Sequence, residues 1–343
     1  MVIAIGTEKG AWLFHPGDER LEGPIMPGWK VTAFTDAADG GYLLATGSNW
    51  FGAAIYRSEN LVDWSQLAES PEWPEGGDRK LSQIWTLTRS EDALYAGVDE
   101  AGLFRSVDNA ATWDPVTGLN EHRTRPGWQP GFGGLALHKI LADPRNPDRL
   151  WVGISAVGAF RSEDGGDSWH PVNHGVAKTV PSKDFDDIGY CVHGLALDRD
   201  DPDLLYRQDH QGVFRSPDCG DTWERSEAGL PGTFGFPMVM DQSTKNLFVV
   251  PLQSDEYRLP PNGRFRVYRS TDGADTWQVS GIGHPDAPTF TAVLRGAMDT
   301  DNAGGVYYGT SSGTFRFTVD SGDSWKTMPW TLPRILSVKV LPT

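Results

Sequence analysis

The stretch SEDGGDSW, residues 162–169, decides the fold because the same eight-residue pattern recurs along the chain. Four further copies and a shortened sixth are present: SVDNAATW (106–113), SPDCGDTW (216–223), STDGADTW (270–277), TVDSGDSW (318–325) and SENLVDW (58–64). We call each copy a box. The copies recur about every 50 residues, with four short strand-like runs in each interval. This period predicts a radial array of small antiparallel sheets.

A second pattern, G-x-F-R-S, leads into the boxes. It reads GLFRS (102–106), GAFRS (158–162), GVFRS (212–216) and GTFRF (313–317), with looser copies RVYRS (266–270) and AIYRS (54–58). Together the two patterns resemble the Asp-box, or BNR, repeat of sialidases, sortilin-type receptors, xyloglucan-hydrolysing enzymes and photosystem assembly factors. The resemblance covers nearly the whole chain. It implies a β-propeller but no single activity, because the same blade serves enzymes, receptors and assembly factors.

The box itself is suited to a tight hairpin turn. Its Asp can accept backbone N–H groups, and its Gly takes positive φ without steric cost. Asn109 and Ala110 stand where other boxes have glycine, so that turn is expected to be strained or differently shaped. The closing Trp can bury its ring and donate its indole N–H. We interpret the boxes as structural staples rather than as calcium or ligand loops.

These patterns predict an all-β fold: a seven-bladed propeller of four-stranded antiparallel blades, forming a single domain over residues 1–343. One blade can be assigned strand by strand, to 138–143, 149–155, 158–162 and 168–173. The N-terminal residues lack a first strand, and 335–341 is a lone strand at the other end. We expect this C-terminal strand to join the N-terminal blade and close the ring, which removes exposed sheet edges. The six remaining blades are expected at 30–70, 83–118, 135–174, 191–229, 235–280 and 290–330.

Composition limits the possible partners and the setting. The chain carries 30 basic and 46 acidic residues, a net charge of −16, which argues against nucleic acid and against an anionic membrane surface. No run reaches the roughly 18 apolar residues of a membrane span, and we expect no signal peptide before the first strand. The two cysteines, Cys191 and Cys219, are expected at opposite ends of a blade and therefore unpaired. A cytoplasmic protein is predicted.

Any site is expected on the face opposite the boxes, where the loops around the channel converge. Six of the eight histidines map there: His122, His138, His174, His193, His210 and His284. Three tryptophans offer aromatic platforms: Trp50, Trp85 and Trp128. The predicted ligand-binding residues are Trp85, His138, His193, Gln208, His210, Arg295 and Arg334.

Two kinds of chemistry remain open at this face. His138, His193 and His210 could hold a divalent metal, although their sequence spacing is not that of a metal motif. Each could equally be hydrogen-bonded to a neighbouring strand. Hydrolysis of a glycoside needs two carboxylates about 5–10 Å apart. The catalytic candidates are Asp99, Glu100 and Asp209. A long segment, 251–263, is either a lid or an ordinary loop elaboration.

The resemblance can be tested against the sialidase residues it implies. Pro333-Arg334-Ile335 resembles the motif entering the first inner strand, and Arg295 could be a second substrate-binding arginine, but no third arginine is found. Xyloglucan-hydrolysing enzymes of this resemblance use two propellers, whereas one is predicted here. The main hypothesis is therefore a propeller that binds a small polar ligand or a protein partner. The alternatives are a glycosidase-like hydrolase and a metal-dependent enzyme that uses the channel histidines.

Overall fold

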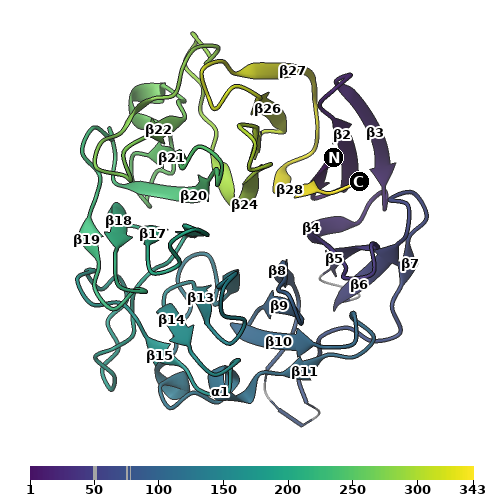
Figure 1. Ribbon diagram of the computed structural model, residues 1–343, viewed down its shortest axis with the longest axis vertical. Coiled ribbons are helices and arrows are strands. Elements are labelled where there is room, and N and C mark those ends of the chain that lie inside the picture. The colour runs from purple at the N-terminus through teal and green to yellow at the C-terminus, as the bar shows by residue number, and fades with distance from the viewer. Residues whose placement is uncertain (49–51, 75, 78) are drawn as a thin grey trace. The chain divides into compact units, whose positions relative to one another are not determined.

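The computed structural model describes residues 1–48, 52–74, 76–77 and 79–343 (Figure 1). Trp50, one of the predicted aromatic platforms, lies outside these residues. The regular secondary structure of the described residues is almost entirely β-strand, and the helices among them are short: α1 (Thr117–Asn120), η1 (Arg125–Gly127) and η2 (Pro261–Gly263). None of the described helices is long and apolar enough to cross a membrane. The chain divides into two compact units, 1–172 with 178–191 and 341–343, and 173–177 with 192–340. The single domain over residues 1–343 stays a prediction.

The first unit contains three antiparallel four-stranded sheets at the predicted positions. They consist of β4 (Lys30–Asp36), β5 (Tyr42–Ser48), β6 (Gly52–Ser58) and β7 (Ser65–Gln66); β8 (Ile84–Arg89), β9 (Leu94–Val98), β10 (Gly102–Ser106) and β11 (Asp114–Pro115); and β12 (Leu137–Ala142), β13 (Leu150–Ile154), β14 (Gly158–Ser162) and β15 (His170–Pro171). Their inner-facing apolar residues form clusters such as that of Leu103, Ile140 and Phe160. The strands assigned to 138–173 are confirmed, with a shorter fourth strand.

The second unit repeats the same plan. Its strands are β16 (Gly194–Leu197), β17 (Leu205–Gln208), β18 (Val213–Ser216) and β19 (Glu224–Arg225); β20 (Phe234–Met240), β21 (Leu247–Leu252), β22 (Tyr268–Ser270) and β23 (Gln278–Val279); and β24 (Val293–Thr300), β25 (Val306–Thr310), β26 (Thr314–Thr318) and β27 (Lys326–Thr331). A further strand, β28 (Ile335–Leu341), pairs in parallel with β24 through Gly296 and Ser337.

The N-terminal strands of the first unit are β1 (Val2–Thr7), β2 (Gly10–His15) and β3 (Arg20–Ile25), paired antiparallel in that order. Leu341, from the other end of the chain, is fully buried in their apolar cluster together with Val2 and Ala4. The Tyr42 hydroxyl donates to the carbonyl of Pro342 at 2.8 Å. The last residues thus complete the core of the N-terminal strands.

The box turns have one repeated hydrogen-bond pattern. In the box at 162–169, Asp164 Oδ1 accepts from the Ser162 hydroxyl at 2.8 Å and from the Ser168 backbone N–H at 2.9 Å, and the Gly166 N–H donates to Ser162 Oγ. The same contacts recur in the boxes that begin at 106, 216, 270 and 318. The structural interpretation of the box is supported by these closed turns.

The turn of Asn109 and Ala110 is strained rather than differently shaped. The φ angles of Asn109 and Ala110 are 60° and 71°, in the same left-handed region as the 70° and 103° of Gly165 and Gly166. An alanine in that region costs about 1–2 kcal/mol relative to a relaxed backbone. The same fold of the turn is therefore kept at the expense of local backbone strain.

The first strand of most four-stranded sheets contains a register shift near its beginning. In β8 the shift lies between Ile84 and Thr86, in β12 between Leu137 and Lys139, and in β24 between Val293 and Met298. Bulges redirect side chains out of the alternating pattern. The residues within these three shifts include Trp85, His138 and Arg295, three of the predicted ligand-binding residues.

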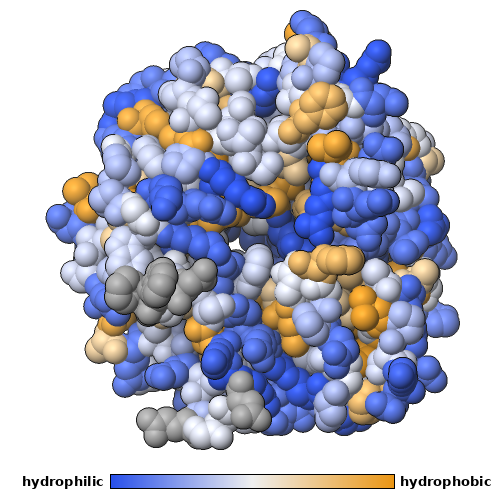
Figure 2. Space-filling view, turned by 180° about the vertical axis from the view of Figure 1, so that it is seen from behind, coloured by the Kyte–Doolittle hydropathy of each residue, from blue (hydrophilic) through white to orange (hydrophobic). Residues whose placement is uncertain are grey.

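The surface is dominated by polar side chains, as the net charge of −16 leads one to expect. On the face shown in Figure 2, hydrophilic residues predominate and apolar residues form small separated groups. The exposed large apolar side chains come from segments far apart in the sequence, among them Val62, Phe132 and Ile282.

Candidate functional site

Two histidines of the second unit lie ring to ring. Strands β16 and β17 pair with Gly194 opposite Gln208, and the His193 N–H donates to the Gln208 carbonyl at 2.9 Å. This register places His193, just before β16, beside His210, just after β17. The centroids of the two imidazoles are 4.8 Å apart. The structure thus brings together His193 and His210, two of the three histidines predicted to share a polar pocket, and their binding role stays a prediction.

Two phenylalanines of β20 enclose the histidine pair. Phe234 and Phe236 stand two residues apart on one strand, so their side chains are on the same face. The centroid of Phe236 lies 4.9 Å from that of His193, and Phe234 lies 5.0 Å from each histidine. The carbonyl between them, Gly235 O, is 2.7 Å from His193 Nδ1. The four rings form one aromatic cluster, buried except for the half-buried His210, which we call the histidine–phenylalanine cluster.

Charged side chains border this cluster. The guanidinium of Arg295 lies 4.9 Å from the Phe236 ring centroid and that of Arg258 lies 5.6 Å from it. Asp255 Oδ2 is 3.4 Å from His210 Nδ1. Arg258 and Asp255 are exposed, whereas Arg295 and His210 are half-buried. These four residues form a polar rim next to the buried rings.

Two residues of the rim, Asp255 and Arg258, come from the segment 251–263, which the sequence predicts to be a lid or an elaborated loop. Gln253 N–H donates to the Leu259 carbonyl at 2.8 Å, and Arg258 N–H donates to the Ser254 carbonyl at 3.0 Å. The loop thus closes on itself and presents Asp255 and Arg258 at its tip. Through Asp255 the segment contacts His210, and its role as a lid stays a prediction.

Burial controls the ionisation of His210. Desolvation lowers the pKa of His210 below its ordinary value of 6.5, and the positive charges of Arg295 and Arg258 lower it further. The Asp255 carboxylate opposes this effect. A lowered pKa keeps the imidazole neutral at neutral pH, and a neutral imidazole can accept a proton or bind a metal.

Two other predicted residues support the loop that carries His210. Gln208 is buried and its side-chain amide donates to three backbone carbonyls, those of Asp209, Gly212 and Thr233. Asp209 is 1% exposed and lies 3.2 Å from the guanidinium of Arg207. Burial raises the pKa of Asp209, and the charge of Arg207 opposes the rise. The observed contacts of Asp209 are those of a loop anchor, and its catalytic role stays a prediction.

Four predicted residues belong to the first unit and are described with it. Trp85 is half-buried, and His138 is buried in the bulge of β12. Asp99 accepts the backbone N–H groups of Ser82 and Gln83 at 3.0 and 2.8 Å, which fixes the start of β8. Glu100 is exposed. The pairing of Asp99 or Glu100 with Asp209 stays a prediction, as does the joining of His138 to the metal candidates.

The remaining predicted residues described here are Arg334 and His284 of the second unit and His122 of the first. Arg334 is exposed between β27 and β28. His284 Nε2 is 2.7 Å from the Ser280 carbonyl, and burial lowers its pKa to about 4. In the first unit, His122 Nδ1 is 2.8 Å from Thr124 Oγ1. These contacts of His122 and His284 are local hydrogen bonds.

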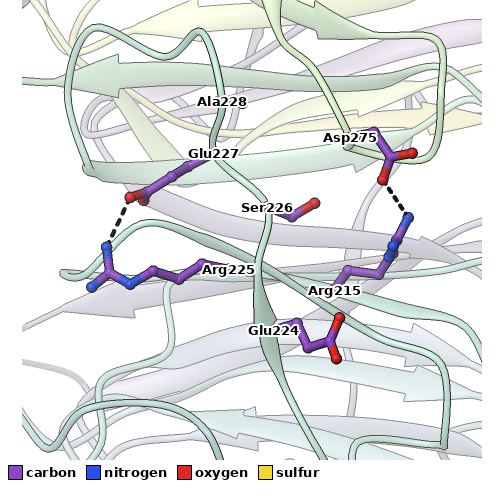
Figure 3. A pocket seen from close by; sticks show the side chains of 7 residues that line it. All are labelled: Arg215, Glu224, Arg225, Ser226, Glu227, Ala228 and Asp275. Atoms are coloured by element: carbon purple, nitrogen blue, oxygen red, sulfur yellow. Dashed lines mark hydrogen bonds and ion pairs between the residues drawn. The ribbon is translucent and has the colours of Figure 1, made fainter.

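A separate hollow of about 340 Å³ lies beside β19 (Figure 3). Its arginines face carboxylates: Arg215 lies 2.7 Å from Asp275, and Arg225 lies 2.8 Å from Glu227. Paired charges of this kind are largely neutralised, and exposed pairs contribute little to binding or stability. We therefore place the candidate site at the histidine–phenylalanine cluster rather than here.

Sequence reasoning missed the apolar half of the site. Phe234 and Phe236 belong to the run FGFPMVM, which reads as an ordinary buried strand. The available signal was the glycine between two aromatics at the start of a strand. A Cβ at Gly235 would lie 3.0 Å from the Gln208 side chain, so a larger residue here would require that side chain to shift. Cys191, which the sequence predicts to be unpaired, is a buried free thiol two residues before His193.

Comparison with known proteins gives relatives of one kind. No protein-family model matches the chain. The xyloglucanase of Paenibacillus sp is 26% identical over 275 residues, which are 69% of this chain and 24% of that protein. Xyloglucanase Xgh74A of Acetivibrio thermocellus is 24% identical over 277 residues, 73% of this chain and 31% of that protein. The oligoxyloglucan-reducing end-specific xyloglucanase of Emericella nidulans is 28% identical over 57% of this chain and 24% of its own length. The chain thus spans a quarter to a third of these relatives.

Solved structures of similar fold cover the whole chain. The periplasmic gluconolactonase PpgL of Pseudomonas aeruginosa matches with a TM-score of 0.63 at 12% identity, over 98% of both chains. The WD40 β-propeller domain of Doa1 matches with a TM-score of 0.56 at 11% identity, over 94% of this chain and 91% of that one. The chain has a β-propeller fold. At these identities the propeller likeness concerns the fold alone.

Proposed function

We propose that this propeller acts on a glycan as a glycoside hydrolase. The observation that carries the proposal is that the curated relatives named above are all xyloglucanases. From the sequence, a glycosidase-like hydrolase is the alternative and ligand binding is the main hypothesis. We favour the hydrolase. Because the chain spans only part of those relatives, their substrate is here a starting point for the test.

The polar rim is the part of the structure that suits a sugar. His210, Asp255, Arg258 and Arg295 offer donors and acceptors for a ligand rich in hydroxyl groups. Charged partners give the stronger hydrogen bonds to such groups. A few convergent polar groups beside an apolar wall are typical of small-molecule sites. The buried rings of the cluster would hold the rim rigid, since their own side chains are packed on all sides.

The proposed hydrolysis requires two carboxyl groups. The sequence offers Asp99, Glu100 and Asp209 as candidates for the acid and base, and Asp209 is the one that is buried against Arg207. Glycoside hydrolysis needs one carboxyl group to protonate the leaving oxygen and a second to attack or to activate water. We further propose that β28 completes the N-terminal sheet, which would give the seven blades and closed ring that the box repeats imply.

The test is release of reducing sugar from xyloglucan, other β-glucans and their oligosaccharides, measured beside binding of the same ligands by calorimetry. We expect turnover that falls at least about a hundredfold in Asp99→Asn or Glu100→Gln, as loss of a catalytic acid or base implies. Arg258→Gln should weaken binding instead.

Other outcomes separate the hypotheses. Binding without sugar release, unchanged in Asp99→Asn and Glu100→Gln, would favour a ligand-binding propeller. Neither binding nor release across the panel would overturn the proposal. A peptide partner is the second candidate, because YCF48, a protein of similar fold with a TM-score of 0.53, was solved bound to the D1 peptide.

A further inference from the structure

We propose that His193 and His210 form the core of a binding site for a divalent transition-metal ion such as zinc. The candidate ligand nitrogens of the two rings lie within 4.8 Å of one another. Zinc takes imidazole nitrogens at about 2.0–2.1 Å, so a small inward movement of His210, which follows β17 in a loop, brings both to one ion. His193 is fixed by the start of β16, which supplies the rigid half of the site.

Each imidazole is oriented through its Nδ1 atom by an oxygen acceptor. His193 Nδ1 lies 2.7 Å from the Gly235 carbonyl, and His210 Nδ1 lies 3.4 Å from Asp255 Oδ2. A carbonyl accepts a proton but cannot donate one, so Nδ1 of His193 is the protonated nitrogen. Its Nε2 then carries the lone pair. One carbonyl and one carboxylate behind two histidines is the outer arrangement typical of metal ligands.

The surroundings of the pair favour metal binding in two further ways. Phe234 and Phe236 pack against the imidazoles and exclude water, which strengthens bonds to a cation. In addition, the buried thiol of Cys191 stands two residues before His193 and gives this segment a soft ligand that zinc accepts.

The charged rim should tune the affinity in opposite directions. Arg258 and Arg295 act on His210 as positive charges, and Asp255 acts on it as a negative charge. A bound cation at His210 must feel the same charges. Removing Arg258 should therefore tighten metal binding severalfold, and removing Asp255 should weaken it.

The test uses the full chain purified without a histidine tag, stripped with a chelator and titrated with Zn²⁺ alone by calorimetry. We expect one equivalent to bind and His210→Gln to weaken binding at least tenfold. His174→Gln is the matched control, because His174 is an exposed histidine of the same unit. Since replacing the buried His193 endangers the fold, His210→Gln carries the test, with circular dichroism to show that the variant is folded.

Two results would overturn the metal site: absence of saturable binding to the folded wild-type chain, or equal affinity in His210→Gln and the wild type. Arg258→Gln and Asp255→Asn add a second criterion, because a metal bound elsewhere would show the same affinity in both. The readout is binding rather than sugar release, so the outcome is independent of the proposed hydrolase activity.

Discussion

A single carboxylate closes each box turn, and Asp164 illustrates how. It accepts hydrogen bonds from Ser162 and Ser168, at both the hydroxyl and the backbone of Ser168. The turn is exposed, so water competes for these groups and each bond contributes only about 1 kcal/mol net. Five boxes repeat the arrangement, and the small contribution of each is multiplied along the chain.

Replacing the carboxylate of one box should lower the stability of the protein by the contribution of the hydrogen bonds that it accepts. We expect Asp164→Ala to lower the free energy of unfolding by roughly 1–2 kcal/mol, since two or three modest hydrogen bonds are lost. Equilibrium unfolding in urea measures the change. Asp167→Ala, an exposed aspartate in the same turn, is the control and should leave stability unchanged. Equal losses in the two variants would contradict the role given to Asp164.

The same carboxylates predict an acid-sensitive fold. Hydrogen bonds to Thr112 and Ser168 lower the pKa of Asp108 and Asp164 from 3.8 to about 2. A carboxyl whose folded pKa is depressed stabilises the fold above its unfolded pKa. That contribution is lost as the pH falls from about 4 through 2. Thermal melts between pH 5 and 2 should show the loss, and it should be smaller in the double variant Asp108→Asn, Asp164→Asn. An identical pH profile would exclude these residues as its source.

Gly165 tests the backbone requirement of the turn without a packing change. Its φ is 70°, and an added Cβ would meet only Asp148 Oδ1 at an ordinary 3.4 Å. We expect Gly165→Ala to destabilise the protein by roughly 1 kcal/mol, the left-handed backbone cost less the entropy gained from a stiffer unfolded chain. Gly17→Ala has open space and no positive φ, so it should show no loss. A neutral Gly165→Ala would mean that the turn relaxes freely.

At the scale of elements, the site depends on a strand register and a loop. Pairing of β16 with β17 brings His193 to His210, and the loop 253–260 adds Asp255 and Arg258. The sequence identified the histidines and the long loop from their expected positions in a blade. It could not show that the loop tip reaches His210, because the path of a loop is set by contacts such as that of Gln253 with Leu259. Nor could periodicity identify the bulges that hold Trp85, His138 and Arg295.

The loop should control the titration of His210 in two opposed ways. Asp255→Asn should lower the pKa of His210, since that carboxylate raises it, whereas Arg258→Gln should raise the pKa. Two-dimensional NMR of the imidazole resonances across pH 4–8 measures both shifts. His170, an exposed histidine on β15, serves as the internal reference. Shifts of the same sign in both variants would show that the loop acts through general packing and not through charge.

At the scale of the whole molecule, the fold was largely predictable. The boxes mark the same turn in successive sheets, and the strands found within 30–331 fall inside the predicted intervals to within one residue, since β20 begins at Phe234 and β27 ends at Thr331. The predictability arises because each sheet is made from consecutive strands, so local patterns determine it. The two ends are the exception, since the contact of Leu341 with Val2 and Ala4 joins residues that are distant in sequence.

A chain ended at Trp330 should fail to fold. It would lack β28, in which Ile335 and Leu341 are fully buried, and would expose the apolar cluster around Val2. We expect loss of the cooperative thermal transition and rapid cleavage by a nonspecific protease. A chain shortened by Thr343 alone is the control and should melt as the wild type does. Cooperative melting of the chain ended at Trp330 would show that the N-terminal strands are stable without the C-terminus.

The burial of Leu341 against the first strands also orders events during synthesis. At 5–20 residues per second, translation of the whole chain takes roughly 20–70 s. Once β1–β3 have left the ribosome, they wait for Leu341, the residue that completes their core, until nearly the whole chain has been made. An unpaired strand edge is a template for pairing with another chain. The nascent N-terminal segment is therefore the part of this protein most in need of a chaperone.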